Sequence, residues 1–140
     1  MINRDQHAWH AWRAMRTLMF ELNDSRDEVS ETLGMSFFRA KTLMKLVDGP
    51  LTMRELMAKL VSDAPYVSVV VDDLEKRGLV ERSVHPGDRR VKVVSLTATG
   101  RESAVLATEI QNRPPAVFES LSANDLAILD RILTALTTEG

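Results

Sequence analysis

The sequence has no cysteine among its 140 residues, and aromatic residues make up only 5% of it. The lack of cysteine excludes disulfides, thiolate metal ligands, a cysteine nucleophile and thiol-based redox sensing. Long apolar runs are also missing, because a membrane span needs roughly 20 such residues and a signal peptide needs an apolar core. We therefore expect a soluble, cytoplasmic protein with no membrane partner, folded as one domain over residues 1–140.

An excess of positive charge is missing too, since the formal net charge is -2. A nucleic-acid hypothesis must therefore rest on where the basic residues lie. Between Lys76 and Lys92 there are six basic residues and two acidic ones. Such a run is usually only a solvated face. Here it coincides with the tip of a predicted hairpin, which favours a function.

Catalytic and metal-binding patterns are weak. His7 and His10 are three residues apart, but no third ligand is spaced to complete a metal site, so ordinary surface histidines are favoured. No histidine stands beside a nucleophile or an acid at a recognisable spacing, and there is no glycine-rich phosphate loop. We expect no enzyme, no metal and no cofactor.

The segment from Leu51 to Thr97 predicts a helix-turn-helix. Thr52 and Glu55 form a capping box that begins its first helix, and residues 61–63 form the turn. Residue preference over 66–71 favours a strand. Periodicity instead predicts a helix over 64–77 that ends at Gly78, because four apolar residues recur at i, i+3, i+4 and i+7: Val67, Val70, Val71 and Leu74. Its outward face would present Tyr66, Ser68, Val69, Asp72, Asp73 and Lys76.

A β-hairpin is predicted next. Two β-branched runs, 79–84 and 91–96, flank the loop 85–90, which contains Pro86 and Gly87. A hairpin after a helix-turn-helix is a wing, and the combination points to duplex DNA.

Further helices are predicted on both sides, over 4–22, from Ser36 to about residue 47, from Thr97 to about Asn112 and from Ser122 onward. Residues 23–34 are interpreted as a connector with one short helical turn at most. The first and last helices each carry an apolar stripe, formed by Trp12, Met15, Met19 and Leu22 and by Leu126, Leu129, Leu133 and Leu136.

The sequence resembles the MarR family of bacterial winged helix-turn-helix transcriptional regulators. The resemblance covers roughly residues 33–102 and is strongest over Leu74–Arg82 and over a spaced series after it: Asp88, Arg90, Val94, Leu96, Thr97 and Gly100. It implies a mainly α fold with a small β-hairpin wing (α+β), a winged DNA-binding lobe at 36–97, and dimerisation helices at 4–22 and 98–138. It also implies a homodimer, most often a repressor, on a pseudo-palindromic operator of double-stranded DNA.

By position, the resemblance implies DNA contacts from the helix over 64–77 in the major groove and from Arg89 or Arg90 in the minor groove, with Asp88 pairing to Arg90. Arg90 could instead only brace the hairpin. The expected DNA-binding residues are Arg54, Tyr66, Ser68, Val69, Lys76, Asp88, Arg89, Arg90 and Lys92.

The chain departs from the family at Ser68-Val69, where members commonly carry Thr-Arg, and at Asp73, where they carry a basic or polar residue. Two interpretations stay open. Either the affinity for DNA depends on the wing, Lys76 and phosphate contacts from earlier helices (Lys41, Lys45 and Arg54), or the operator is recognised through thymine methyl groups and DNA shape. The alternative function is a winged-helix protein-interaction module with weak or no specific DNA binding.

An effector pocket for a small aromatic or lipophilic molecule is also implied, with Arg16 as a possible anion partner; plain core is the commoner use of such side chains. The residues that could line it are Trp12, Met15, Arg16, Met19, Phe37 and Phe38. The expected dimer interface comprises Trp12, Leu22, Leu126, Leu129, Leu133 and Leu136, the alternative being that each helix covers its own protomer's core.

Overall fold

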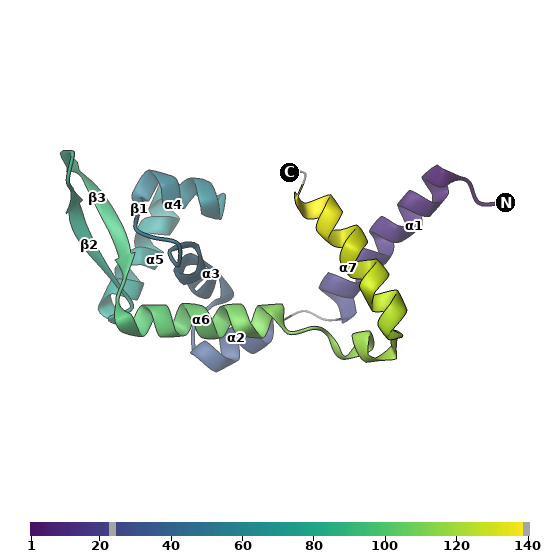
Figure 1. Ribbon diagram of the computed structural model, residues 1–140. Helices are drawn as coiled ribbons and strands as arrows, with labels where there is room; N and C mark the ends of the chain where they lie inside the picture. Colours follow the sequence, from purple (N-terminus) through teal and green to yellow (C-terminus); the bar gives the residue numbers. More distant parts are fainter. Residues whose placement is uncertain (23–24, 139–140) are drawn as a thin grey trace.

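The computed structural model describes residues 1–22 and 25–138 and shows a mainly helical chain with one small antiparallel sheet (Figure 1). In chain order the elements are α1 (Arg4–Thr17), the π-helical η1 (Leu18–Leu22), α2 (Arg26–Leu33), α3 (Phe37–Lys45), β1 (Leu51–Thr52), α4 (Met53–Leu60), α5 (Ala64–Lys76), β2 (Val80–His85), β3 (Asp88–Leu96), α6 (Ala98–Asn112), the 3-10 helix η2 (Ala116–Ser120) and α7 (Ala123–Thr138). The fold class expected from the sequence is confirmed. In the part of the chain described, no helix is long and apolar enough to cross a membrane.

Elements α2 to α6 form the winged lobe, and its core lies between α3, α4, α5 and α6. The ambiguous segment at 66–71 is helical, and all four of its predicted core residues are fully buried: Val67, Val70, Val71 and Leu74. Periodicity therefore decided correctly against residue preference, because one helical face of valines fills the interior while a strand would have exposed half of them.

The predicted caps are present. Thr52 and Glu55 form the reciprocal capping box at the start of α4, and the Asp63 side chain accepts a hydrogen bond from the Tyr66 backbone N–H at the start of α5. These contacts satisfy backbone donors that have no partner inside a helix. They fix where the two helices of the helix-turn-helix begin.

The wing is longer than predicted, and the six-residue loop expected at 85–90 is wrong. His85 pairs with Asp88 across the hairpin, so only Pro86 and Gly87 form its turn, and the register is irregular at Val84/His85. A third strand, β1, was missed; it pairs Leu51 with Val94 on β3. Two residues are too few to give an alternating pattern.

The expected connector at 23–34 is wrong where the structure describes it. Residues Arg26–Leu33 form an eight-residue helix that buries Val29 fully and ends at Gly34 in the left-handed conformation, with φ of 65°. Asn23 and Asp24 of that connector lie outside the described residues. The helix expected over 4–22 is α-helical only as far as Thr17 and then widens into the π-helix η1.

The turn between α4 and α5 contains a strained residue. Val61 has φ of 51° and ψ of 53°, a left-handed conformation that crowds a β-branched side chain, and it is 89% exposed. We expect Val61→Gly to raise the free energy of unfolding by about 0.5–1 kcal/mol, since relief of strain exceeds the added freedom of the unfolded chain. Urea denaturation measures this effect. Val61→Ala keeps a Cβ atom and is the matched control, so equal stability of the two variants would contradict the prediction.

Candidate nucleic-acid interface

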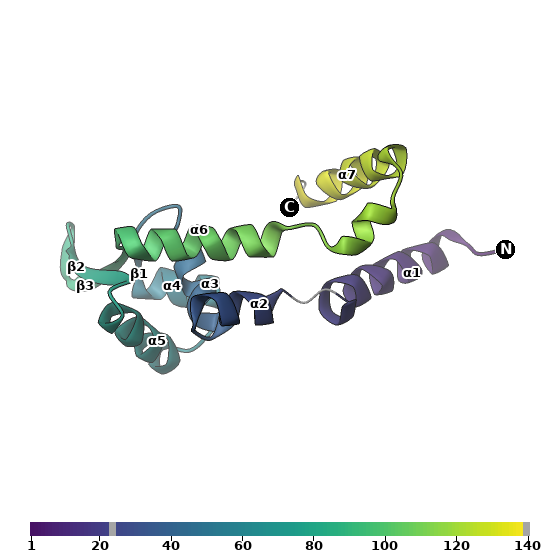
Figure 2. The ribbon, with the colours of Figure 1, turned by 90° about the horizontal axis from the view of Figure 1, so that it is seen from below.

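The outward face of α5 lies at the same end of the winged lobe as the β2–β3 hairpin, far from α1 and α7 (Figure 2). Tyr66, Val69 and Lys76 are exposed on this face and Ser68 is half-buried. The Tyr66 ring packs against Phe38 of α3, with ring centroids 4.8 Å apart and planes inclined at 54°. The helix therefore offers a mixed apolar and polar face rather than a basic one.

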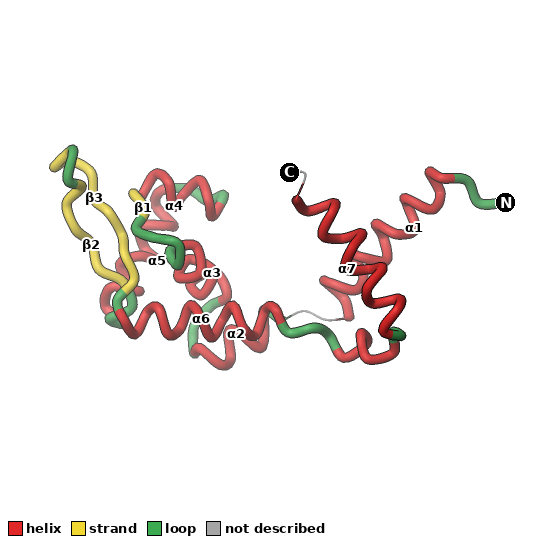
Figure 3. The backbone as a smooth tube through the Cα atoms, viewed as in Figure 1, coloured by secondary structure: helices red, strands yellow, loops and turns green. Residues whose placement is uncertain are grey.

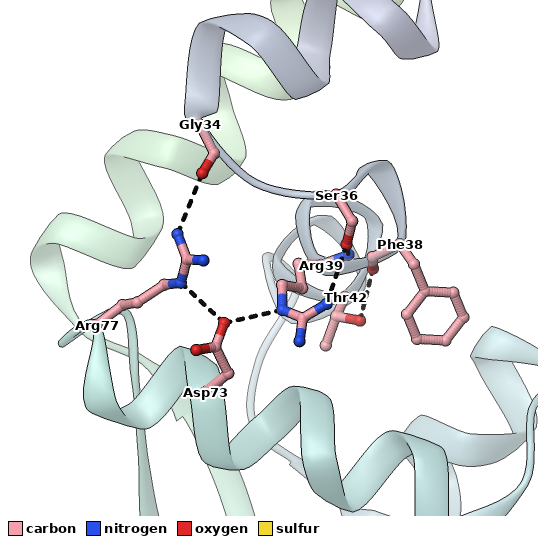
Figure 4. A network of polar contacts seen from close by, with 7 residues as sticks. All are labelled: Gly34, Ser36, Phe38, Arg39, Thr42, Asp73 and Arg77. Atoms are coloured by element: carbon pink, nitrogen blue, oxygen red, sulfur yellow. Dashed lines mark hydrogen bonds and ion pairs between the residues drawn. The ribbon is translucent and has the colours of Figure 1, made fainter.

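Asp73, which departs from the family pattern, is engaged inside the protein (Figure 4). Its Oδ2 accepts hydrogen bonds from Arg39 Nε of α3 and from Arg77 Nε one turn further along, each at 2.8 Å. Arg77 Nη1 also donates to the carbonyl oxygen of Gly34 at 3.2 Å. These bonds, first that of Arg39 and then that of Arg77, hold the pKa of Asp73 below its usual value. Asp73 thus joins α5 to α3 and, through Arg77, to the end of α2.

Asp72 is engaged as well, at the foot of the wing. Its Oδ1 lies 2.6 Å from Arg82 Nη2 of β2, and the same guanidinium lies 3.4 Å from Glu75 Oε1. The Arg82 backbone N–H also donates to Glu75 at 3.2 Å. Both aspartates of α5 therefore face arginines of this chain, and Arg82 ties the orientation of the wing to that of α5.

The wing tip holds the expected pair. Arg90 donates to Asp88 from its backbone N–H at 3.0 Å, from Nε at 3.2 Å and from Nη2 at 3.3 Å. These bonds hold the pKa of Asp88 below its usual value, so the carboxylate is ionised at neutral pH. Arg89 and Lys92 are exposed on the same strand. At the turn itself, the Gly87 backbone N–H donates to His85 Nδ1 at 2.9 Å.

The basic residues suggested for phosphate contacts separate into two groups. Arg54 is exposed on α4, within the helix-turn-helix. Lys41 and Lys45 instead line an open hollow of about 720 Å³ beside α3, η1 and the end of α6. Arg54 thus lies on the helix-turn-helix, whereas the two lysines line the hollow.

That hollow lies where the effector pocket was expected, but with a different lining. Met19 and Phe37 line it; Trp12, Met15, Arg16 and Phe38 do not. Phe38 packs on Tyr66 instead. The complete lining is Leu18, Met19, Phe20, Ser25, Arg26, Phe37, Lys41, Met44, Lys45, Thr108, Gln111, Asn112, Arg113, Pro115 and Phe118. Among the residues described, no cluster of acidic and histidine side chains could hold a metal ion.

The terminal helices stand clear of the winged lobe, and α1, η1 and α7 contain no buried residue. They cross in Figure 1 but lie apart in Figure 2. Trp12 is 62% exposed, and Leu22, Leu126 and Leu136 are exposed as well, while Leu129 and Leu133 are half-buried. Within one protomer these stripes do not cover the core, which disfavours the alternative that each helix serves its own protomer.

Comparison with known proteins identifies the segment that contains the helix-turn-helix. A model of the MarR family matches residues 46–92, which span α4, α5 and most of the wing. YsmB of Bacillus subtilis (strain 168), described as an uncharacterized HTH-type transcriptional regulator, is 32% identical over 92 residues, 65% of this chain and 63% of YsmB. Residues 46–92 are therefore a MarR-family segment. The aligned part spans less than two thirds of that relative, and the family comprises transcriptional regulators, not enzymes.

Solved structures extend this MarR-family likeness to the flanking helices. RV1404 from Mycobacterium tuberculosis has a TM-score of 0.77 and 24% identity, with 100% of this chain and 96% of that chain covered. A MepR mutant from S. aureus, bound to an oligodeoxyribonucleotide, has a TM-score of 0.66 and 25% identity, with 92% and 96% covered. The likeness in fold therefore includes the terminal helices and not only the matched segment.

Sequence reasoning missed three arginines that shape this candidate interface: Arg39, Arg77 and Arg82. The i, i+4 spacing of Asp73 and Arg77 was a usable signal for a helical ion pair. The bonds of Arg39 to Asp73 and of Arg82 to Asp72 join residues on different elements. Only the packing of α3 and β2 against α5 brings these partners together, and no local spacing encodes it.

Proposed function

We propose that this chain is a homodimeric transcriptional repressor that binds a pseudo-palindromic operator in double-stranded DNA. The observation that carries the proposal is the pairing of two exposed features on one end of the lobe. The outward face of α5 is free of unpaired carboxylates, and beside it the wing presents Arg89 and Arg90. A helix suits the major groove, and arginines suit a narrow minor groove.

The dimer rests on the apolar stripes of the terminal helices. Large side chains such as Trp12, Leu22 and Leu136 are exposed on helices that bury nothing in the protomer. Contiguous exposed apolar surface of this kind marks an interaction site. A second copy would bury both stripes and set two winged lobes at a fixed spacing, as a two-fold operator requires.

Release by a ligand is the third part of the proposal. The hollow between η1, α3 and the end of α6 combines apolar Met19 and Phe37 with basic Lys41 and Lys45. An aromatic or lipophilic molecule carrying a negative charge fits that chemistry. Because η1 belongs to the terminal helices and α3 to the winged lobe, a bound ligand would change the spacing of the two lobes and so reduce DNA affinity.

Selection from a random-sequence DNA pool, followed by binding measurements on the winning duplex, tests the proposal. We expect half-sites about 10 bp apart, centre to centre, which is one turn of the DNA. If each protomer neutralises three phosphates, log affinity should fall with log salt at a slope of about -5. Sedimentation should show two copies of the 15.7 kDa chain in the free protein and in the complex.

Two results would contradict the proposal: a flat salt dependence, or equal affinity for the selected duplex and for random duplex. The alternative of a protein-interaction module was motivated by the two aspartates of α5 and by the missing arginine. Since Asp72 and Asp73 are both engaged with arginines of this chain, they no longer argue against DNA binding.

A further inference from the structure

Val69 is an exposed aliphatic residue on the outward face of α5. It is 56% exposed, whereas the four residues of the opposite face are fully buried. At 100° per residue it lies one turn from Tyr66 and on the same side as Lys76. In a complex with this face in the major groove, the two methyl groups of Val69 would contact the base edges.

Folding does not need a valine at this position. Valine is a poorer helix former than alanine, because its branched Cβ restricts the side chain against the preceding turn. The side chain contributes nothing to the core, from which it points away. A solvent-facing valine in the middle of α5 is therefore available to a partner outside the protomer.

The neighbouring polar groups do not define a polar readout. The carboxylates of Asp72 and Asp73, which could accept a hydrogen bond from cytosine, are held by Arg82 and by Arg39 with Arg77. Tyr66 is braced against Phe38, so its ring forms a fixed wall beside Val69. Within this mixed face, Val69 and the Tyr66 ring thus form an apolar, preorganised part.

In the major groove of unmodified DNA, the C5-methyl group of thymine is the apolar group that a base presents. We propose that Val69 is a specificity-determining residue that recognises a thymine in each half-site through this methyl group. This inference rests on the proposed function and adds the chemistry by which α5 reads its operator. It assigns to Val69 the role left open by the missing arginine.

The test removes only the methyl group. A duplex is selected from a pool made without methylated cytosine, so thymine is its sole source of base methyl groups, and each thymine is then replaced by deoxyuridine. Wild-type protein should lose about fourfold in affinity per half-site at one position, and about 15-fold when both half-sites are changed. Val69→Ala should have the same affinity for duplexes that carry thymine or deoxyuridine at that position. At any other thymine that wild-type protein recognises, the variant should still prefer thymine to deoxyuridine.

Val105→Ala is the matched control, because Val105 is 45% exposed on α6, away from α5 and the wing, and this variant should discriminate like wild type. Val69→Ala should fold, since alanine favours the helix, and a melting curve verifies this. If deoxyuridine costs wild type nothing anywhere, or costs Val69→Ala the same, the role of Val69 is refuted. If no sequence is enriched at all, the proposed function itself fails instead.

Discussion

Replacing Arg90 by alanine is expected to weaken operator binding about 30-fold or more while leaving the dimer and its stability intact. A guanidinium has five N–H donors, and Asp88 uses two of them through Nε and Nη2. The rest are free for DNA on a side chain that is 90% exposed. Each protomer contributes one wing, so removal of one charge-assisted hydrogen bond counts twice in a dimer. Fluorescence anisotropy on the selected duplex measures the weaker binding.

A second variant separates contact with DNA from bracing of the hairpin. Asp88→Ala removes the brace but keeps the positive charge of Arg90. If Arg90 acts only through the shape of the tip, Asp88→Ala and Arg90→Ala should weaken binding equally. If Arg90 touches DNA, Asp88→Ala should cost far less, because one carboxylate near the phosphates is removed as well. We expect the second result.

Salt dependence and a distant arginine complete the experiment. Arg90→Ala should reduce the steepness of the salt slope by about 0.9 for each phosphate that the variant no longer neutralises. Arg131→Ala on α7 removes the same charge far from the wing and should bind like wild type. The tube view shows the hairpin and α7 on opposite sides of the structure (Figure 3). Loss of Arg89 together with Arg90 should abolish specific binding; unchanged binding of this double variant would refute the role of the wing.

The elements that were predicted correctly are those whose signals are local. The capping box at Thr52 and Glu55, the helical repeat from Val67 to Leu74 and the hairpin around Pro86 and Gly87 each involve neighbours in sequence. The errors arise where tertiary contact decides. Strand β1 exists because Leu51 meets Val94, and α2 is helical because Val29 reaches the core.

The site follows the same division. Exposed Arg89 and the Asp88–Arg90 pair, two residues apart, lie in one hairpin and were found from the motif. The role of Asp73 was misjudged, because its charge looked free in the sequence and its partner Arg39 is 34 residues away. An acidic residue on a DNA-facing helix is unfavourable only if it is unpaired, and pairing is a property of the fold. Without the arginine, the outward face of α5 is therefore mixed apolar and polar, and its paired carboxylates do not make it repulsive to DNA.

Replacing Gly100 by alanine is expected to lower the free energy of unfolding by at least about 3 kcal/mol, the largest stability effect we predict. Gly100 is buried in the first turn of α6, against the corner where α5 passes into β2. An added Cβ would lie 1.8 Å from the carbonyl oxygen of Leu79 and 2.8 Å from its carbonyl carbon. Both are backbone atoms, so no rotamer change can relieve the clash.

The corner cannot simply open, because hydrogen bonds close it. The Thr97 backbone N–H donates to the Leu79 carbonyl oxygen at 3.1 Å, and Thr97 Oγ1 donates to the Gly78 carbonyl oxygen at 2.7 Å. The same hydroxyl oxygen accepts the Gly100 N–H at 3.0 Å as the cap of α6. Making room for a methyl group would break these bonds and shift α6 away from the foot of the wing. This close approach explains why the wing motif extends to a glycine four residues after its last strand residue.

Urea denaturation at a fixed protein concentration measures the effect, since unfolding of a dimer depends on concentration. Gly87→Ala is the matched control. Its added Cβ would meet only the His85 side chain, at 3.3 Å, on a turn where that ring can move, so we expect a change within about 0.5 kcal/mol. A Gly100→Ala variant as stable as Gly87→Ala would show that α6 does not approach Leu79 this closely. A large destabilisation confined to Gly100→Ala would show that the absence of a side chain at Gly100 allows α6 to pack against Leu79. Under the proposed function, this contact holds the junction that orients both α5 and the wing toward DNA.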